Sequence, residues 1–235
     1  MKKRLTFGIL IFLSLFIFSC SSDDNINNSL LAESPEAITQ FDNSNFGIYK
    51  GVFIGSSGIV VINVNNDGNV TATMIIDGTT YIFITNEVIQ VNQQTVINFT
   101  SGNDSFTFSV SSNGTNPEIS NLTIEGHPNA NIILVKETSV ILTELFEGSY
   151  AGTGNSTDAG TFNAIVTENE MAVLAYSTTS SVFFTIDGII NNNSISGVAS
   201  TGTNVTGTLN GDNIIGTWSD SQSNENGNWS GTRTY

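Results

Sequence analysis

The chain has 235 residues, of which 39% are hydrophobic and 11% charged, and its formal net charge is −15 at pH 7. With six basic residues against 21 acidic ones, it lacks the clustered Lys and Arg that bind phosphate, which argues against nucleic acid and anionic lipid surfaces as direct partners. Abundant Gly, Asn, Ser and Thr beside Ile, Val and Phe predict an all-β protein with many turns.

Residues 1–19 have the pattern of an export signal. Residues 1–4 are cationic, and residues 5–18 carry no charge. A helix of that length would reach about 21 Å, short of the ~30 Å hydrocarbon core of a bilayer. We therefore predict a signal peptide over residues 1–19 rather than a membrane span.

The end of this segment resembles the lipobox of bacterial lipoproteins. Ile17 takes the apolar −3 position, Ser19 the small −1 position and Cys20 the modified position, while Phe18 departs from the usual small residue. The resemblance implies lipid attachment at Cys20, as a thioether-linked diacylglycerol with an amine acylated, for example, by palmitate. The alternative is a cleaved secretory signal with an incidental cysteine. Because Cys20 is the chain's one cysteine, no intramolecular disulfide can form.

The acidic run that follows, residues 21–24, is similar to the export signal of surface lipoproteins in the Bacteroidetes group. That resemblance implies a lipid-anchored protein on the outer face of the outer membrane. The alternative is a solvated tether that faces the periplasm.

Beyond the anchor, the pattern changes from polar to strand-like. Residues 20–45 are predicted to form the lipid anchor and a flexible tether, with a short helical turn near residues 35–38. From residue 46, short apolar runs alternate with turn signals: the runs are 58–65, 70–76 and 79–85, and turns fall at 66–69 and 77–78. This spacing predicts an antiparallel β-meander, closed as a small barrel or packed as a sandwich.

The meander is predicted to occur twice, as related β modules over residues 46–137 and 138–235. Residues 46–51 reappear with changes as residues 146–152, and Lys136 aligns with Arg233 near the ends of the two copies. Chance similarity between two meanders is the alternative. The connector near residues 137–145 is expected to carry a short helix.

The second copy also has a repeated apolar-x-Gly pattern. An apolar residue precedes a glycine by two positions and therefore shares one face of its strand. The repeated glycines indicate strong curvature or close backbone approach, which favours a closed sheet. The pairs are Ile195 with Gly197, Val205 with Gly207, Ile214 with Gly216, and Trp229 with Gly231.

Both modules show a weak resemblance to calycins, the lipocalin-like barrels. An aromatic residue beside glycines in the first strand and a basic residue in the last carry it: Tyr49 and Lys136 in one copy, Tyr150 and Arg233 in the other. The resemblance implies that each pair closes one end of a barrel, and that a small apolar molecule is bound. Tyrosine replaces the family's tryptophan, and the modules are short for ligand-holding barrels.

Few residues point to catalysis or to a cofactor. His127, the one histidine, is predicted in an exposed turn, and no His/Cys cluster suits zinc. Residues 65–69 could bind calcium but are more typical of a hairpin turn. Glu168 and Glu170 fall in one predicted turn and are expected to be solvated. We therefore predict no catalytic residue, no metal and no cofactor.

Two tryptophans are the tentative ligand contacts. Trp218 and Trp229 lie on the last predicted strands, where they either fill the core or stack on sugar rings.

The sequence thus predicts a membrane-anchored lipoprotein with a non-catalytic binding or structural role, facing a glycan, an envelope protein or a small apolar ligand. The alternatives are a lipocalin-like carrier of small apolar molecules and a carboxylate-based glycoside hydrolase. A large apolar cavity would favour the carrier, and an acidic cleft with two facing carboxylates would favour the enzyme.

Overall fold

The computed structural model describes residues 31–54 and 58–235. The predicted signal peptide, Cys20 and the acidic run all lie outside these residues. Within the described part, no helix is long and apolar enough to cross a membrane. Apart from the 3-10 helix η1 (Thr39–Phe41), the regular structure there consists of sixteen antiparallel strands in two similar modules, which confirms the predicted fold class.

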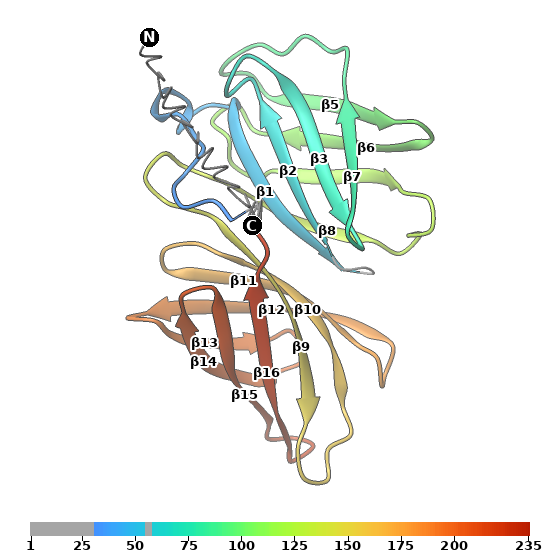
Figure 1. Cartoon of the computed structure of the whole chain (residues 1–235), viewed down its shortest axis with the longest axis vertical. Coiled ribbons are helices and arrows are strands. Elements are labelled where there is room, and N and C mark those ends of the chain that lie inside the picture. The colour runs from blue at the N-terminus through green and yellow to red at the C-terminus, as the bar shows by residue number, and fades with distance from the viewer. Residues whose placement is uncertain (1–30, 55–57) are drawn as a thin grey trace, which may run out of the picture.

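Module 1 forms the upper half of the molecule in Figure 1. Its sheet order, β7-β6-β5-β4-β3-β2-β1-β8, is a meander that curls until β8 pairs with β1. Because β7 and β8 share no hydrogen-bonded register, this barrel is nearly closed rather than closed. The strands are β1 (Gly47–Ile54), β2 (Gly58–Val64), β3 (Val70–Ile76), β4 (Thr79–Ile84), β5 (Thr95–Ser101), β6 (Asp104–Val110), β7 (Glu118–Thr123) and β8 (Asn131–Lys136).

Module 2, the lower half of Figure 1, repeats this meander and closes fully. Its last strand pairs with its first, so that Trp229 lies opposite Tyr150 and Gly231 opposite Gly148. The strands are β9 (Glu144–Gly152), β10 (Ala159–Val166), β11 (Glu170–Ser177), β12 (Val182–Asn191), β13 (Ser194–Ala199), β14 (Asn204–Asn210), β15 (Asn213–Asp220) and β16 (Glu225–Arg233).

Residues that alternate along each strand point into the barrel, as the two-residue strand period requires. In module 1 the interior is filled by large side chains that are at most 1% exposed. They include Tyr49, Phe53, Ile62, Met74, Phe83, Phe99, Phe106 and Phe108. Ring pairs such as Phe99 with Phe106, whose centroids are 5.0 Å apart, pack this core closely.

The apolar residues of the repeated apolar-x-Gly pattern all lie inside module 2, in its buried core. The glycines do not form one continuous row. Gly207 pairs with Gly216, but Gly197 pairs with Val205. The pattern therefore predicted the interior face correctly, whereas the strand register offsets the glycines from one another.

Residues 36–45, which belong to the expected flexible tether, are packed against module 1. Asn45 is fully buried and donates through its side-chain amide to Gln90 O and Thr95 Oγ1, at 2.8 and 2.6 Å. The ammonium group of Lys136 donates to the carbonyls of Phe41 and Ser44. The short helix forms at Thr39–Phe41, just after the expected position. The tether expectation is thus wrong for this segment, because it supplies hydrogen-bond partners to buried groups of module 1.

The connector between the modules contains no helix. Residues 138–141 form an isolated bridge, and Glu137 Oε1 accepts a hydrogen bond from the Thr143 backbone N–H at 3.1 Å. This side-chain acceptor holds the connector in a turn, which replaces the expected helix.

The two modules pack through the outer faces of β1, β9, β10 and β11. Val52, Leu145 and Ile165 form a separate buried cluster there. Beside it, the ammonium group of Lys50 lies 2.6 Å from Glu137 Oε1, and neither side chain is exposed to solvent. The two barrels therefore share a core of their own, outside either interior.

Candidate functional site

A cavity of about 210 Å³ occupies the interior of module 2 at the end away from module 1. β9 runs from the interface between the modules toward this free end, as Figure 1 shows. At the other end, inward side chains fill the barrel: Phe146, Ala164, Val166, Ile190, Ile195 and Ile214. The cavity is therefore a cup with a packed floor and one mouth.

Small side chains explain why this half of the barrel is hollow. Ala175 and Ala199 line the cavity and are 1% and 4% exposed. Gly207 and Gly216 face inward without a side chain, and the indole of Trp229 occupies the space above them. A Cβ added at Gly207 or Gly216 would lie 2.3 or 2.5 Å from Trp229 Cζ2. Among the described core residues of module 1, phenylalanines fill the interior instead: Phe53, Phe83, Phe99, Phe106 and Phe108.

The wall of the cavity is aromatic. The ring of Tyr150 lies 6.0 Å from that of Phe184 and 6.2 Å from that of Trp218, with interplanar angles of 74° and 88°. Deeper in, the rings of Phe162 and Trp229 lie 6.1 Å apart. In these edge-to-face contacts the edge of one ring meets the face of the other, which fixes the rings on the cavity wall.

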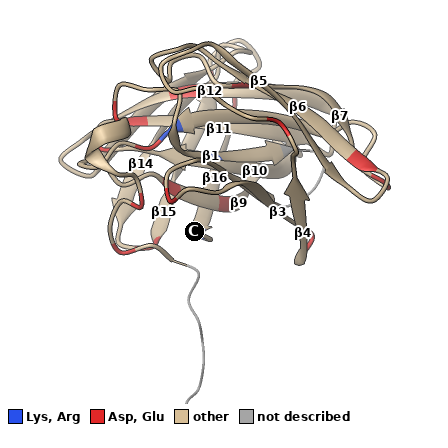
Figure 2. Cartoon of the chain, turned by 90° about the horizontal axis from the view of Figure 1, so that it is seen from above, with Lys and Arg blue, Asp and Glu red and all other residues tan. Residues whose placement is uncertain are grey.

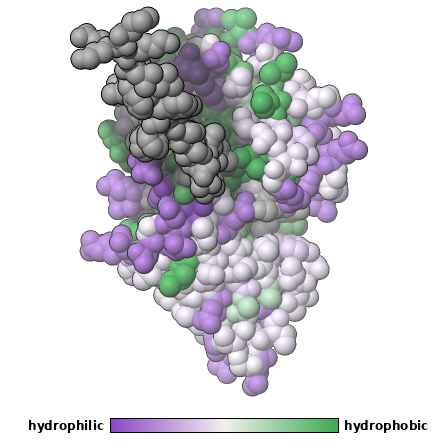
Figure 3. Space-filling view, viewed as in Figure 1, coloured by the Kyte–Doolittle hydropathy of each residue, from purple (hydrophilic) through white to green (hydrophobic). Residues whose placement is uncertain are grey.

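Both tentative ligand contacts are on this wall. Trp218 and Trp229 are 8% and 7% exposed, so neither offers a ring on the outer surface. On the face of module 2 seen in Figure 3, most side chains are polar or of intermediate hydropathy. The two tryptophans therefore belong to the barrel core and also line a cavity within it.

Two polar atoms in this wall lack a hydrogen-bond partner. They are Trp218 Nε1 and the Tyr150 hydroxyl, which lies beside the Ser177 and Asp158 side chains, whereas Trp229 Nε1 donates to Thr217 O at 3.1 Å. Burial raises the pKa of Tyr150 to about 12, so the phenol keeps its proton at neutral pH. Buried polar atoms are almost always paired in proteins, so these two mark a place for a ligand atom or a water molecule.

The mouth carries carboxylates and hydroxyls. Asp158 accepts a hydrogen bond from Ser177 Oγ at 2.7 Å. Asp220 accepts one from the Gln222 N–H at 2.8 Å, and this bond lowers the pKa of its carboxyl group. Other cavity-lining residues at this end, from the turns between strands, are Ser180, Thr201 and Thr203.

Arg233, the one basic residue of module 2, lies at the opposite end of the barrel. Its Nη1 atom is 3.1 Å from Glu144 Oε1 and 3.4 Å from Asp212 Oδ1. In the register Arg233 faces Phe146, four residues before Tyr150, so these two residues do not close one end together. In module 1 the matching pair does meet: Tyr49 pairs with Lys136, whose ammonium lies 5.8 Å from the ring centroid.

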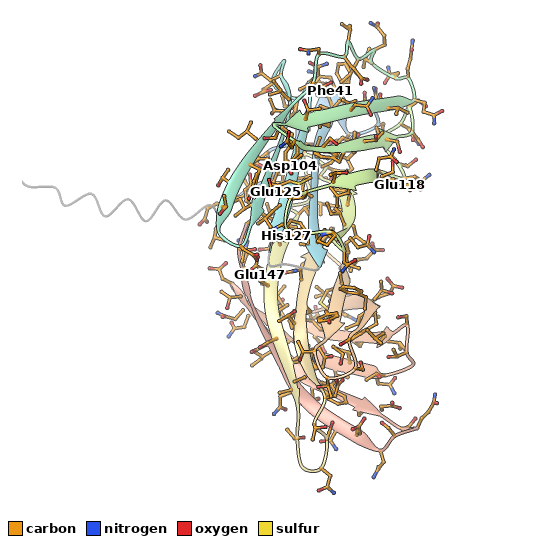
Figure 4. The ribbon with its side chains drawn as sticks, turned by 90° about the vertical axis from the view of Figure 1, so that its right-hand side faces the viewer. Phe41, Asp104, Glu118, Glu125, His127 and Glu147 are labelled. Atoms are coloured by element: carbon orange, nitrogen blue, oxygen red, sulfur yellow. The ribbon has the colours of Figure 1, made fainter. Side chains whose placement is uncertain are left out.

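The other residues singled out from the sequence lie apart from the cavity. His127 is half-buried rather than exposed, in the connection between β7 and β8, where Figure 4 shows it near Glu125 on module 1. Asp67 accepts from Asn63 Nδ2 within the β2–β3 hairpin. Glu168 is exposed in the β10–β11 turn, and Glu170 is exposed at the start of β11. Over residues 31–54 and 58–235, no three His, Cys, Asp or Glu side chains are placed to hold a metal ion.

Sequence reasoning identified the two tryptophans but missed the other parts of the site. Asp158 and Asp220 looked like any of the scattered acidic residues, and Ala175 like any core position. The available signal was compositional: the interior positions of the second copy are smaller than those of the first.

No known family model matches the chain, and no curated protein matches its sequence.

Proposed function

We propose that the protein is a non-catalytic binding lipoprotein whose second barrel holds a small, largely apolar molecule. The observation that carries this proposal is the cup in module 2, with its aromatic wall, packed floor and single mouth. Ligand sites are typically concave and apolar with a few placed polar groups, and this cavity has all three properties. A dry cavity of about 150 Å³ accepts a benzene ring, so about 210 Å³ suits a ligand built on one ring.

The carboxylates at the mouth favour binding over glycoside hydrolysis. A hydrolase needs a general acid whose pKa is raised, so that it is protonated at working pH. The pKa of Asp220 is instead lowered by the hydrogen bond from Gln222. The tyrosine that lies between the carboxylates and the aromatic wall stays neutral, and the site holds no histidine.

The proposal places this barrel at a membrane through lipid on Cys20, on the outer face of the outer membrane. The lipobox-like residues and the acidic run behind Cys20 support it. One acyl chain binds a membrane only marginally, and a second makes the anchor stable.

Labelling of cells with a fatty-acid analogue tests the anchor. The wild-type chain should take up label, and Cys20→Ala should take up none. Equal labelling of both chains, or an unlabelled wild type, would rule the anchor out without touching the binding proposal.

Tryptophan fluorescence tests the binding site directly, because the chain's two tryptophans both line the cavity. We expect 2-phenylethanol, a neutral one-ring probe, to change the emission of the purified full chain saturably, with a Kd of roughly micromolar to millimolar size. Ala175→Phe places a ring inside the cup and should abolish the change. Ala172→Phe is the matched control, since residue 172 lies on the same strand but points out of the barrel.

A thermal melt of each variant keeps the result interpretable. Ala175→Phe should melt cooperatively, because its ring fills an existing space. Binding that survives in a folded Ala175→Phe chain, or no saturable binding of any one-ring probe to the wild type, would contradict the proposed site.

A further inference from the structure

We propose that the cavity of module 2 selects a small organic cation, a molecule with an apolar ring and an ammonium group at one end. The inference rests on the proposed function and deepens it, because it assigns the charge of the ligand.

The first observation is the charge around the mouth. Module 2 has nine acidic residues and one basic residue, Arg233, which gives a net charge of −8 over residues 138–235. The guanidinium group of Arg233 lies at the far end, between Glu144 and Asp212. In Figure 2 acidic residues are spread over the molecule, with little blue among them. A mouth with this field attracts cations and repels the carboxylate of a fatty acid.

The second observation is that two of these carboxylates line the cavity itself. Asp158 is oriented by Ser177 Oγ at 2.7 Å, and Asp220 by the Gln222 N–H and the Ser223 hydroxyl, at 2.8 and 3.1 Å. Each carboxylate is held in place by a donor, so it needs no rearrangement to meet a cation. The lowered pKa of Asp220 keeps that group ionised at neutral pH.

The third observation is the aromatic wall beside these carboxylates. The Tyr150 hydroxyl lies near Ser177 and Asp158, and the side chains of Tyr150 and Trp218 are 9% and 8% exposed on the cavity wall. Their rings lie edge to face, 6.2 Å apart, with Phe184 beside Tyr150. Ring faces around a cavity stabilise an ammonium group by cation–π attraction, and the tyrosine oxygen can accept a hydrogen bond from it.

Together these groups match the two halves of such a ligand. The deeper part of the cup, with Phe162 and Trp229, suits an apolar ring. The mouth, with Asp158 and Asp220, suits the ammonium group. No positive side chain lines the cavity to receive a negative group.

Three probes of equal size and different charge test the inference: 2-phenylethylammonium, 2-phenylethanol and phenylacetate, titrated into the purified full chain by tryptophan fluorescence and calorimetry. We expect the cation to bind about tenfold more tightly than the alcohol, and phenylacetate most weakly. The preference for the cation should shrink as salt is raised, because its attraction is electrostatic.

Charge-removing variants locate the preference. Asp158→Asn and Asp220→Asn should each weaken binding of the cation about three- to tenfold and leave binding of the alcohol unchanged. Each asparagine keeps one acceptor oxygen, for Ser177 Oγ at position 158 and for the Gln222 N–H at position 220. Asp187→Asn is the control, because it makes the same charge change on the outside of β12, where the side chain is exposed.

The outcomes separate this inference from the proposed function. Equal affinity for the cation and the alcohol, or tighter binding of phenylacetate, would overturn the charge assignment while the binding site stands. If Asp158→Asn, Asp220→Asn and the control Asp187→Asn reduce the cation preference equally, the preference reflects net charge alone. That result would also overturn the charge assignment. Failure of all three probes to bind would remove the proposed function itself.

Discussion

The space inside module 2 depends on where single glycines sit beneath large rings. Trp229 points inward from β16, its indole lies over Gly216 of β15 and Gly207 of β14, and its N–H donates to Thr217 O at 3.1 Å. It can lie there because Gly207 and Gly216, which face each other across the two strands, have no side chains. These residues thus set both the position of the tryptophan and the shape of the cavity.

Gly207→Ala should therefore destabilise the protein by about 1–3 kcal/mol. The new Cβ would lie 2.3 Å from Trp229 Cζ2 and 2.4 Å from the Ile215 carbonyl oxygen, so both ring and strand must shift. Urea unfolding measures the loss of stability, and a change in native tryptophan emission reports the displaced ring.

Gly188→Ala provides the matched control. It also lies within a strand, but its added Cβ would meet the flexible end of Met171 at 3.2 Å and Ser196 O at 3.4 Å. Its effect should be small, because alanine suits a strand interior better than glycine does. Equal losses in the two variants would show that the ring contact at Gly207 does not matter.

At the scale of elements, the hairpins were predictable because their turn chemistry is local. Gly68 and Asp77 adopt positive φ values of 91° and 47° in turns that the sequence indicated. Asn65, predicted as the end of a strand, has a φ of 52° and already belongs to the turn. Alternation along the strands then identified interior residues such as Ile195 and Val205. Closure of β16 onto β9 was not predictable in register, because it joins residues about 80 positions apart.

The segment before β1 shows why the polar residues near the N-terminus were misread. Residues 36–45 have no period, and their partners, Thr95 and Lys136, are remote in the sequence. Burial lowers the pKa of Lys136 to about 8, and the backbone carbonyls of this segment solvate its ammonium group. A composition typical of a tether can thus also serve to cap a barrel end.

The cavity was only partly predictable for the same reason. The sequence singled out Trp218 and Trp229 as candidate ligand contacts. A single sequence, however, does not distinguish a tryptophan that fills a core from one that lines a binding site. The difference arises from the small side chains opposite them, Ala175 and Ala199, and from the turns that carry Asp158 and Asp220. Which turns meet at one end of a barrel follows from closure, not from any local pattern.

At the scale of the whole molecule, a charged network joins the two barrels. Glu137 accepts hydrogen bonds from Lys50 Nζ at 2.6 Å, the Glu36 N–H at 2.8 Å and the Thr143 N–H at 3.1 Å. The Lys50 ammonium also lies 5.0 Å from the ring centroid of Tyr235, near the end of module 2. The N-terminal segment, both modules and the C-terminal residue thus meet at one buried pair.

Glu137→Gln should destabilise the protein by about 3 kcal/mol, because the buried Lys50 ammonium loses its nearest counter-charge and keeps only that of Glu36, a partly exposed carboxylate 3.4 Å away. Urea unfolding followed by two signals gives the measurement: tryptophan emission reports module 2 alone, and far-ultraviolet circular dichroism reports both barrels. The transitions should coincide in the wild type if the shared interface couples the modules, and the variant should lower both midpoints.

Two further variants decide whether the pair acts through its charge or through its packing. Lys50→Met combined with Glu137→Gln should recover most of the loss, since it removes the under-compensated ammonium while the amide oxygen can still accept from the Glu36 and Thr143 N–H groups. Glu168→Gln, which removes an exposed carboxylate in a hairpin turn, should leave both midpoints unchanged. A Glu137→Gln chain within about 0.5 kcal/mol of the wild type would show that Glu36 and water compensate the Lys50 charge, and that the apolar cluster of Val52, Ile59, Leu145 and Ile165 holds the barrels together without Glu137.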